Sequence, residues 1–294
     1  MKSIIKYPGS KWSIASWIIQ HFPEHHSYLE PFFGSGAVLF NKKRSQIETV
    51  NDLDGYVTNL FSWVRDDPEQ LARMVYWIPY ARDSYEQAIA ICKDELQVKD
   101  RAHSLVYAAA FCAKTMMGYG FRTNETKVGF KRDVQGREAA YAANGWKNLP
   151  DKIIKAAERL RGVQIENRPA VQLIREFRFQ NVLIYADPPY VLSARSCSRA
   201  MYKHEMTDDD HAELLDALRK HPGPVIISGY ASDLYDDQLR DWYREEIKVR
   251  DQAGNKKQEV IWMNFQPCIQ QQLLVFADKE TAYYADSGVM MPAT

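Results

Sequence analysis

Val182-Leu183-Ile184-Tyr185-Ala186 is immediately followed by Asp187-Pro188-Pro189-Tyr190, and this stretch decides the fold class. The first five residues are apolar throughout, which is typical of a strand that is covered on both faces of a parallel sheet. Short β-branched runs alternate with helical patterns elsewhere, which indicates an α/β fold. The sequence therefore places Asp187 at the carboxyl end of a central strand, where open α/β sheets bind their ligands.

The remaining strands are expected around this one. They cover residues 28–31, 47–51, 163–166, 225–228, 246–249 and 260–264, and residues 273–276 are a further candidate. Ala253-Gly254-Asn255 separates two late strands and predicts an antiparallel hairpin at the sheet edge. The interval 58–160 is mainly helical, so we expect a ligand-binding domain formed by residues 1–57 and 161–294, with a helical domain inserted at 58–160.

Composition narrows the class of protein. The 294 residues are 46% hydrophobic and 26% charged, as in ordinary globular proteins. The chain has no run of about 18 uncharged apolar residues and no signal-peptide pattern, so we expect a cytoplasmic protein without a membrane span. The four cysteines form no CxxC pair and the histidines lack metal-ligand spacing, so we expect neither a metal site nor a disulfide framework.

Basic residues gather in two segments although the net charge is zero. Between Lys114 and Arg137, six basic residues face only Glu125 and Asp133. Residues 193–204 carry three basic residues and no acidic neighbour. The candidates for phosphate contacts in these segments are Lys114, Arg122, Asn124, Lys127, Lys131, Arg195, Arg199 and Lys203. Local charge of this kind favours a nucleic-acid partner, and solvated loops are the alternative.

The tetrapeptide Asp187-Pro188-Pro189-Tyr190 carries chemistry of its own. Two prolines remove two backbone donors and fix two φ angles, so the segment is stiff and its carbonyl groups are free to accept hydrogen bonds. The aromatic ring of Tyr190 follows directly. Stiff acceptors beside a stacking ring suit a planar molecule that presents an amino group.

A second motif predicts a nucleoside site. Leu29-Glu30-Pro31-Phe32-Phe33-Gly34-Ser35-Gly36 precedes an expected helix at 37–41, and the glycines let a ligand approach the backbone. The next strand ends in Asn51-Asp52, and an acid at this place accepts both hydroxyl groups of a ribose. The chain lacks the GxGxxG fingerprint, which disfavours a dinucleotide such as NAD. S-adenosyl-L-methionine, a nucleoside without a diphosphate, fits the two features.

The ordered motifs resemble those of the Dam-type, alpha-class, site-specific DNA adenine N6-methyltransferases. The resemblance rests on Tyr7-Pro8-Gly9-Ser10-Lys11, the 29–36 motif, Asn51-Asp52 and Asp187-Pro188-Pro189-Tyr190. It implies a Rossmann-like S-adenosylmethionine-dependent fold in which the inserted domain recognises the DNA target. Arg122-Thr123-Asn124, followed by Gly129 and Phe130, is similar to the DNA-contacting hairpin of that family.

The resemblance also implies residue roles. Tyr7 and Lys11 correspond to the pair that contacts the cofactor, although the family often has tryptophan in place of Tyr7. Asp52 corresponds to the ribose-binding acid. The turn that holds the methionine portion corresponds to Phe32, Gly34 and Gly36, with Glu30 beside it. Asp187, which also borders the cofactor, corresponds with Pro188, Pro189 and Tyr190 to the catalytic site.

The expected reaction is direct transfer to the N6 atom of an adenine flipped out of double-stranded DNA, with Tyr190 as the stacking face. The alternatives left open are methylation of the cytosine amino group (N4), an RNA or small planar amine as substrate, and a catalytically silent DNA-binding relative. Pro267-Cys268 could suggest methylation at a cytosine carbon, but it lies far from the catalytic motif, so we expect an ordinary thiol. A restriction-endonuclease counterpart, the oligomeric state and the recognised DNA sequence remain open.

Overall fold

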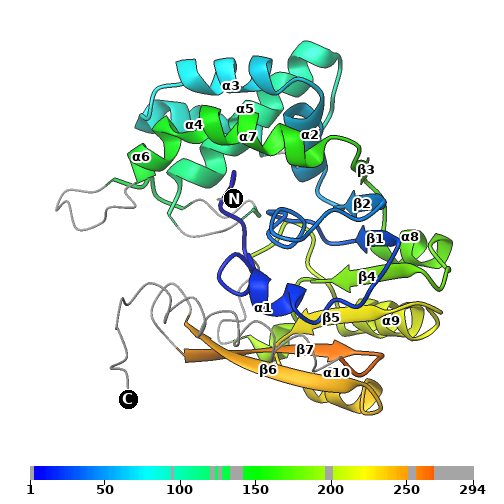
Figure 1. Ribbon diagram of the computed structural model, residues 1–294. Coiled ribbons are helices and arrows are strands. Elements are labelled where there is room, and N and C mark those ends of the chain that lie inside the picture. The colour runs from blue at the N-terminus through cyan, green and yellow to red at the C-terminus, as the bar shows by residue number, and fades with distance from the viewer. Residues whose placement is uncertain are drawn as a thin grey trace, which may run out of the picture.

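A seven-stranded sheet forms the centre of the protein (Figure 1). The computed structural model describes residues 3–93, 96–119, 123–124, 128–132, 142–195, 201–250 and 256–267. The strands are β1 (Ser27–Glu30), β2 (Ile47–Asn51), β3 (Gln164–Glu166), β4 (Val182–Ala186), β5 (Val225–Gly229), β6 (Tyr243–Arg250) and β7 (Lys256–Met263). Their order is β3-β2-β1-β4-β5-β7-β6. The prediction of an α/β fold is therefore confirmed.

The strand pairings place the ends of β1, β2, β4 and β5 on one side of the sheet. These strands are parallel, with Leu29 opposite Ile184 and Ala186 opposite Ile227. β7 runs antiparallel to both β5 and β6, which confirms the expected edge hairpin. The residues 253–255 expected to form its turn, and the strand candidate 273–276, lie outside the described residues. The carboxyl ends of the parallel strands therefore form one edge that can hold a ligand.

Alternating side chains give the sheet a core on each face. Ile184 and Ile227 share a buried cluster with α8 (Ala170–Glu176), α9 (Asp208–Arg219) and α10 (Asp233–Gln238). Leu183 and Tyr185 belong to the other cluster, which includes α1 (Ala15–Ile19). Because successive residues of a strand point to opposite faces, the apolar run Val182–Ala186 supplies both cores.

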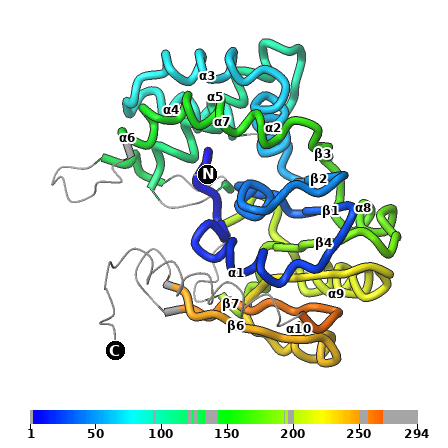
Figure 2. The backbone as a smooth tube through the Cα atoms, in the orientation of Figure 1, coloured from blue at the N-terminus to red at the C-terminus, as the bar shows by residue number. Residues whose placement is uncertain are grey.

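Helices fill the connection between β2 and β3. They are α2 (Gly55–Asp66), α3 (Pro68–Trp77), α4 (Arg82–Ile91), α5 (Arg101–Met117), α6 (Ala142–Lys147) and α7 (Leu149–Leu160). Figure 2 shows that they form a separate group beyond the β3 and β2 side of the sheet. Side chains of Asp54, Asp67 and Asp100 cap α2, α3 and α5. The predicted helical insertion is thus present, and its first helix begins at Gly55 rather than at residue 58.

A buried ion-pair cluster ties this helical group to the sheet. Glu48 on β2 accepts hydrogen bonds from Arg159 on α7, at 2.8 Å from Nη2, and from the Nζ atom of Lys42, at 2.6 Å. Glu48 is only 3% exposed.

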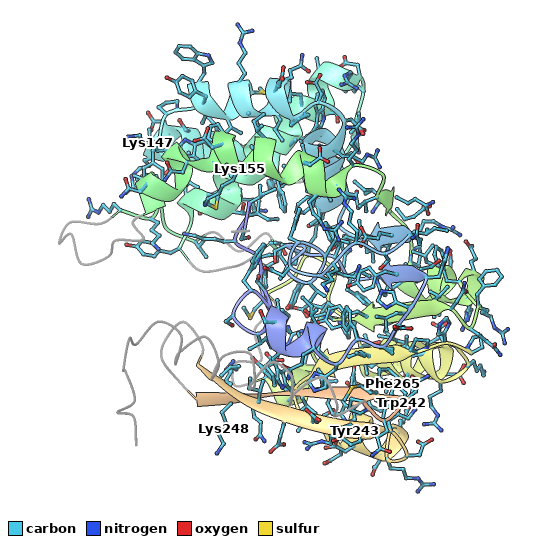
Figure 3. All side chains as sticks on the ribbon, in the orientation of Figure 1. Lys147, Lys155, Trp242, Tyr243, Lys248 and Phe265 are labelled. Carbon is cyan, nitrogen blue, oxygen red and sulfur yellow. The ribbon has the colours of Figure 1, made fainter. Side chains whose placement is uncertain are left out.

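In Figure 3, Lys147 and Lys155 mark α6 and α7, while Tyr243 and Lys248 mark β6 at the opposite edge of the sheet.

The helix predicted directly after the glycine turn that follows β1 is absent. Residues 37–41 form hydrogen-bonded turns rather than a helix. There the side chain of Asn41 donates to the carbonyl oxygen of Ala37, a local bond that competes with helix continuation.

Within the described ranges, no helix combines the length and apolarity needed to cross a membrane. Among those same residues, no group of three or more acidic, histidine or cysteine side chains is placed to hold a metal ion. Cys92 and Cys112 are buried free thiols, whereas Cys197 and Cys268 lie outside the described residues.

Candidate active site

A cavity of about 340 Å³ lies at the carboxyl ends of the parallel strands. Its walls come from residues 7–11, the turn after β1, residues 51–54 at the end of β2, and Asp187 after β4. Residues 169–172 before and within α8 and residues 204–206 complete it. The volume lies within the range of sites for small molecules and cofactors. The cavity thus joins three of the motifs that the sequence singled out, although they are far apart along the chain.

The turn after β1 needs its glycines. Gly34 and Gly36 have φ angles of +49° and +68°, which residues with a side chain adopt only at a cost. A Cβ atom on Gly34 would lie 2.9 Å from the ring of Tyr7, and one on Gly36 would lie 2.6 Å from the ring of Phe33. The turn therefore brings its backbone close to the cavity. Of its predicted ligand-binding residues, Phe32 and Gly34 line the cavity. Gly36 is not among the described residues that line it, and it lies close to the rings of Phe33 and Phe40.

Asp52 is fixed by backbone amides at both carboxylate oxygens. The amide of Gly34 donates to its Oδ2 atom at 2.8 Å, and that of Asp54 donates to Oδ1 at 2.9 Å. Desolvation raises the pKa of Asp52 to about 7, and the neighbouring Asp54 adds to the rise. Each oxygen keeps a lone pair for a further donor. Asp52 is therefore an oriented acceptor on the wall of the cavity.

Asp187 is held through one of its two oxygens. Its Oδ1 atom lies 2.9 Å from the Nζ atom of Lys11 and accepts a hydrogen bond of 2.9 Å from the hydroxyl of Ser228 at the end of β5. Burial opposes the charge of Lys11, but Asp187 and Glu259 outweigh it and raise the pKa of Lys11 above its usual value. Because both contacts use Oδ1, the other oxygen is the one left for a ligand within the described part of the chain.

Glu30 lies in the same cavity wall and is 2% exposed. Burial raises its pKa to about 8; the Tyr28 hydroxyl, which donates to Oε2 at 2.8 Å, opposes the rise, and Asp187 adds to it. Glu30 is thus a carboxyl group with a strong preference for its neutral form.

Tyr190 packs beside the cavity rather than lining it. Its hydroxyl donates to the Oε2 atom of Glu259 on β7 at 2.6 Å, and its ring meets the ring of Tyr230 edge-on at a centroid distance of 4.6 Å. The Nζ atom of Lys11 lies 4.7 Å from the ring centroid. Pro189 lines the cavity, whereas Pro188 is not among the described residues that do. Asp187, Tyr190 and Lys11 therefore form one connected group.

Tyr7 and Tyr202 both line the cavity, and their ring centroids are 6.2 Å apart. Tyr202 belongs to a segment that Glu205 folds by accepting hydrogen bonds from the amides of Met201 and Tyr202. The amide of Thr123 donates to the carbonyl oxygen of Met201. The segment after β4 is therefore in direct contact with the helical insertion.

The predicted phosphate-contacting residues have different environments. Arg122, Lys127 and Arg199 lie outside the described residues. Arg195 donates two hydrogen bonds to Glu205 and its side chain is 6% exposed. Lys203 places its Nζ atom 4.9 Å from the ring centroid of Tyr56. Lys114 donates to the carbonyl oxygens of Cys92 and Thr123. Three of the predicted cations thus make contacts within the protein.

Asn124 and Lys131 are half-buried. Lys131 follows the bridge between Gly118 and Phe130, in the same part of the insertion. Asn124 and Lys131 therefore stay predictions as DNA contacts.

Sequence reasoning missed Ser228 and Glu259. Ser228 is the penultimate residue of β5, the strand beside β4, so the rule that ligand sites gather at the carboxyl ends of strands could have found it. Glu259 is an acid followed by the apolar residues Val260-Ile261-Trp262, and a buried acid in such a strand is a signal in itself.

Comparison with known proteins agrees with this geometry. The sequence profile of the D12 class N6 adenine-specific DNA methyltransferases matches residues 7–255. The chain is 22% identical over 277 residues to the type II methyltransferase M1.LlaDCHI of Lactococcus lactis subsp. cremoris, which covers 87% of this chain and 90% of that protein. It is 22% identical over 284 residues to the DNA adenine methylase of Vibrio cholerae serotype O1, with coverages of 92% and 98%. The retron Ec67 DNA adenine methylase of Escherichia coli is 24% identical over 263 residues, or 86% of each chain.

Proposed function

Because the chain belongs to the D12 class N6 adenine-specific DNA methyltransferase family and so methylates the N6 atom of adenine in DNA, we propose that Asp187 is its catalytic acceptor. The observation that carries this assignment is the ion pair of Asp187 with Lys11, which fixes one carboxylate oxygen beside the cavity. We further propose S-adenosyl-L-methionine as the methyl donor and double-stranded DNA as the substrate.

The cavity fits such a donor. Asp52 offers two oriented oxygens to the hydroxyl groups of a ribose, and the glycine turn at 34–36 leaves its backbone open to a ligand. Tyr7, Lys11, Glu30 and Phe32 border the same space. When bound, the donor supplies a methyl group on a positively charged sulfur.

The chemical task of the protein is to activate a weak nucleophile. The lone pair of an exocyclic amino nitrogen is delocalised into the adenine ring. The free oxygen of Asp187 and the carbonyl oxygen of Pro188 accept the two N–H groups, which directs the lone pair towards the methyl group. After transfer, the carboxylate of Asp187 accepts the proton that the methylated nitrogen releases. Positioning and placed charge supply the rate enhancement, without a covalent enzyme–base intermediate.

The adenine must leave the DNA helix to reach this site. Flipping a base costs a few kcal/mol, which stacking and phosphate contacts offset. We propose Tyr190, whose ring lies beside the cavity, as the stacking face; the preceding residue, Pro189, lies on the cavity wall. Residues 58–160 form the target-recognition domain, with Asn124 and Lys131 among its DNA contacts. A cytoplasmic location and a restriction-endonuclease counterpart are further predictions.

A pair of variants tests the assignment. Asp187→Ala is expected to abolish methyl transfer to DNA while cofactor binding, measured by calorimetry, is largely retained. Cys268→Ala is expected to keep full activity. Hydrolysis of the methylated DNA to nucleosides should yield N6-methyl-2′-deoxyadenosine. Equal activity in the two variants, or N4-methyl-2′-deoxycytidine as the product, would overturn the assignment.

A further inference from the structure

Glu259 lies at an unusual place for a carboxyl group. It belongs to β7, which pairs with β5 on one side and β6 on the other, and it is 8% exposed. Burial raises the pKa of Glu259, and Asp187 raises it further. Lys11, the hydroxyl of Tyr190 and Lys257 lower it. A buried carboxyl group is costly unless its partners compensate. Three of these residues, Lys11, Tyr190 and Asp187, form the catalytic group.

The contact between Glu259 and Tyr190 is short and direct. The hydroxyl of Tyr190 donates to Oε2 at 2.6 Å. The backbone at the other end of Tyr190 is stiffened by Pro188 and Pro189. Tyr230, one residue beyond β5, meets the ring edge-on. The ring is thus held at its base, at its edge and at its tip.

The position of this ring affects Lys11 and Asp187. The Nζ atom of Lys11 lies 4.7 Å from the ring centroid of Tyr190 and 2.9 Å from the Oδ1 atom of Asp187. A displaced ring would remove one of the surfaces that hold the ammonium group. Glu259 is therefore linked to the acceptor through two intermediate side chains.

We propose that Glu259 is a positioning residue for methyl transfer, which fixes the ring of Tyr190 through its hydroxyl. The inference rests on the proposed function, because it takes Tyr190 as the stacking face for the target adenine. A base stacked on a correctly placed ring presents its amino nitrogen at the acceptor pair. A ring free to rotate stacks the base in several poses, of which few are reactive.

The test is a double-mutant cycle in kcat with unmethylated bacterial genomic DNA. Glu259→Leu fills a similar volume in an apolar strand but cannot accept the hydroxyl, and Tyr190→Phe removes the hydroxyl itself. A displacement of about 1 Å in a catalytic constellation costs up to about 100-fold, so each variant should lose about 10- to 100-fold in kcat. The double variant should lose no more kcat than the more impaired of the two single variants, because both changes remove the same contact.

Controls separate positioning from folding. Glu259→Gln keeps an acceptor oxygen and should restore most of kcat. Glu246→Leu changes an exposed carboxylate on β6 that pairs with Arg244, and should leave kcat unchanged. The KM for S-adenosylmethionine should change little in all variants, and rates are normalised to the fraction that binds it.

Two results would overturn the inference. One is a lower melting temperature in Glu259→Leu with wild-type kcat per folded molecule, which indicates a structural role alone. The other is a loss of kcat in the double variant that equals the product of the two single losses, because this outcome means that the two changes act independently. The inference and the proposed function fail separately: if Asp187→Ala still methylates DNA, the proposed function fails, whatever the cycle shows.

Discussion

Lys11 and Asp187, which come from opposite parts of the chain, form an ion pair with 2.9 Å between Nζ and Oδ1. Their side chains are only 4% and 17% exposed. The same Nζ atom donates to the carbonyl oxygen of Gly9 at 2.6 Å, so the lysine is itself anchored. Ser228 adds a second donor to the same carboxylate oxygen. The acceptor is therefore oriented from two sides before any substrate arrives.

Ser228→Ala tests this orientation. The variant loses a hydrogen bond to a charged group, which contributes about 1.5–3 kcal/mol, so kcat is expected to fall by about tenfold or more. The KM for S-adenosylmethionine should stay close to that of the wild type, because Ser228 is not among the described residues that line the cavity. Single-turnover methyl transfer measures the effect. A wild-type rate would show that Lys11 alone fixes the carboxylate.

Gly36→Ala is expected to destabilise the protein and weaken cofactor binding. The added Cβ atom would lie 2.6 Å from Phe33 and 2.7 Å from Phe40, in addition to the strain at φ +68°. Gly162→Ala is the matched control, since Gly162 has φ +83° but no atom within 4 Å of the added carbon. The control should cost about 1–2 kcal/mol from backbone strain, and Gly36→Ala should cost more. Chemical denaturation compares them, and equal losses would exclude the predicted clash.

Glu30 predicts a pH dependence of stability. Its pKa is raised to about 8 in the folded protein, from 4.5 in the unfolded chain. The folded state therefore binds a proton that the unfolded state has released between these values, so this contribution is present at low pH and is lost as the pH rises through about 8. The stability of Glu30→Gln relative to the wild type should therefore be greater at pH 9 than at pH 6, two values on either side of the folded pKa. Urea denaturation at both pH values measures this; an unchanged difference would contradict it.

Lys131→Ala and Arg195→Ala should separate a DNA contact from a structural one. Loss of a phosphate contact lowers the salt dependence of DNA binding by about one unit of slope, as expected for Lys131→Ala. Arg195 is bound to Glu205 on the cavity wall, so Arg195→Ala should leave the slope unchanged and raise the KM for S-adenosylmethionine. Binding titrations at several salt concentrations decide between them. The opposite pattern would assign the phosphate contact to Arg195.

The sequence predicted the strands best where both faces are buried. The bounds of β2 and β4 agree with the expected ones, whereas β6 extends from residue 243 to 250 instead of 246 to 249. The extra residues Tyr243, Arg244, Glu245 and Arg250 are mostly charged, so they lack the apolar pattern of a strand. Local pattern therefore predicts a buried strand more completely than an edge strand.

The cavity motifs were predictable because each has a turn or a stiff segment with a local physical cause. The contacts of Arg195 and Glu259 were not. Arg195 pairs with an acid ten positions later, and Glu259 meets a tyrosine from another strand connection. A cation in a loop looks the same in sequence whether it faces phosphate or a buried acid. Only the folded chain distinguishes the two environments.

The placement of the helices in the β2–β3 connection has an evolutionary consequence. This connection leaves and rejoins the sheet at the neighbouring strands β2 and β3. Asp187 follows β4 and Ser228 lies on β5, both on the other side of β1. Lengthening or replacing the intervening helices need not disturb the register of those inner strands. With the target-recognition role proposed for these helices, exchange of one contiguous stretch of gene would change the sequence preference and leave the reaction itself unchanged.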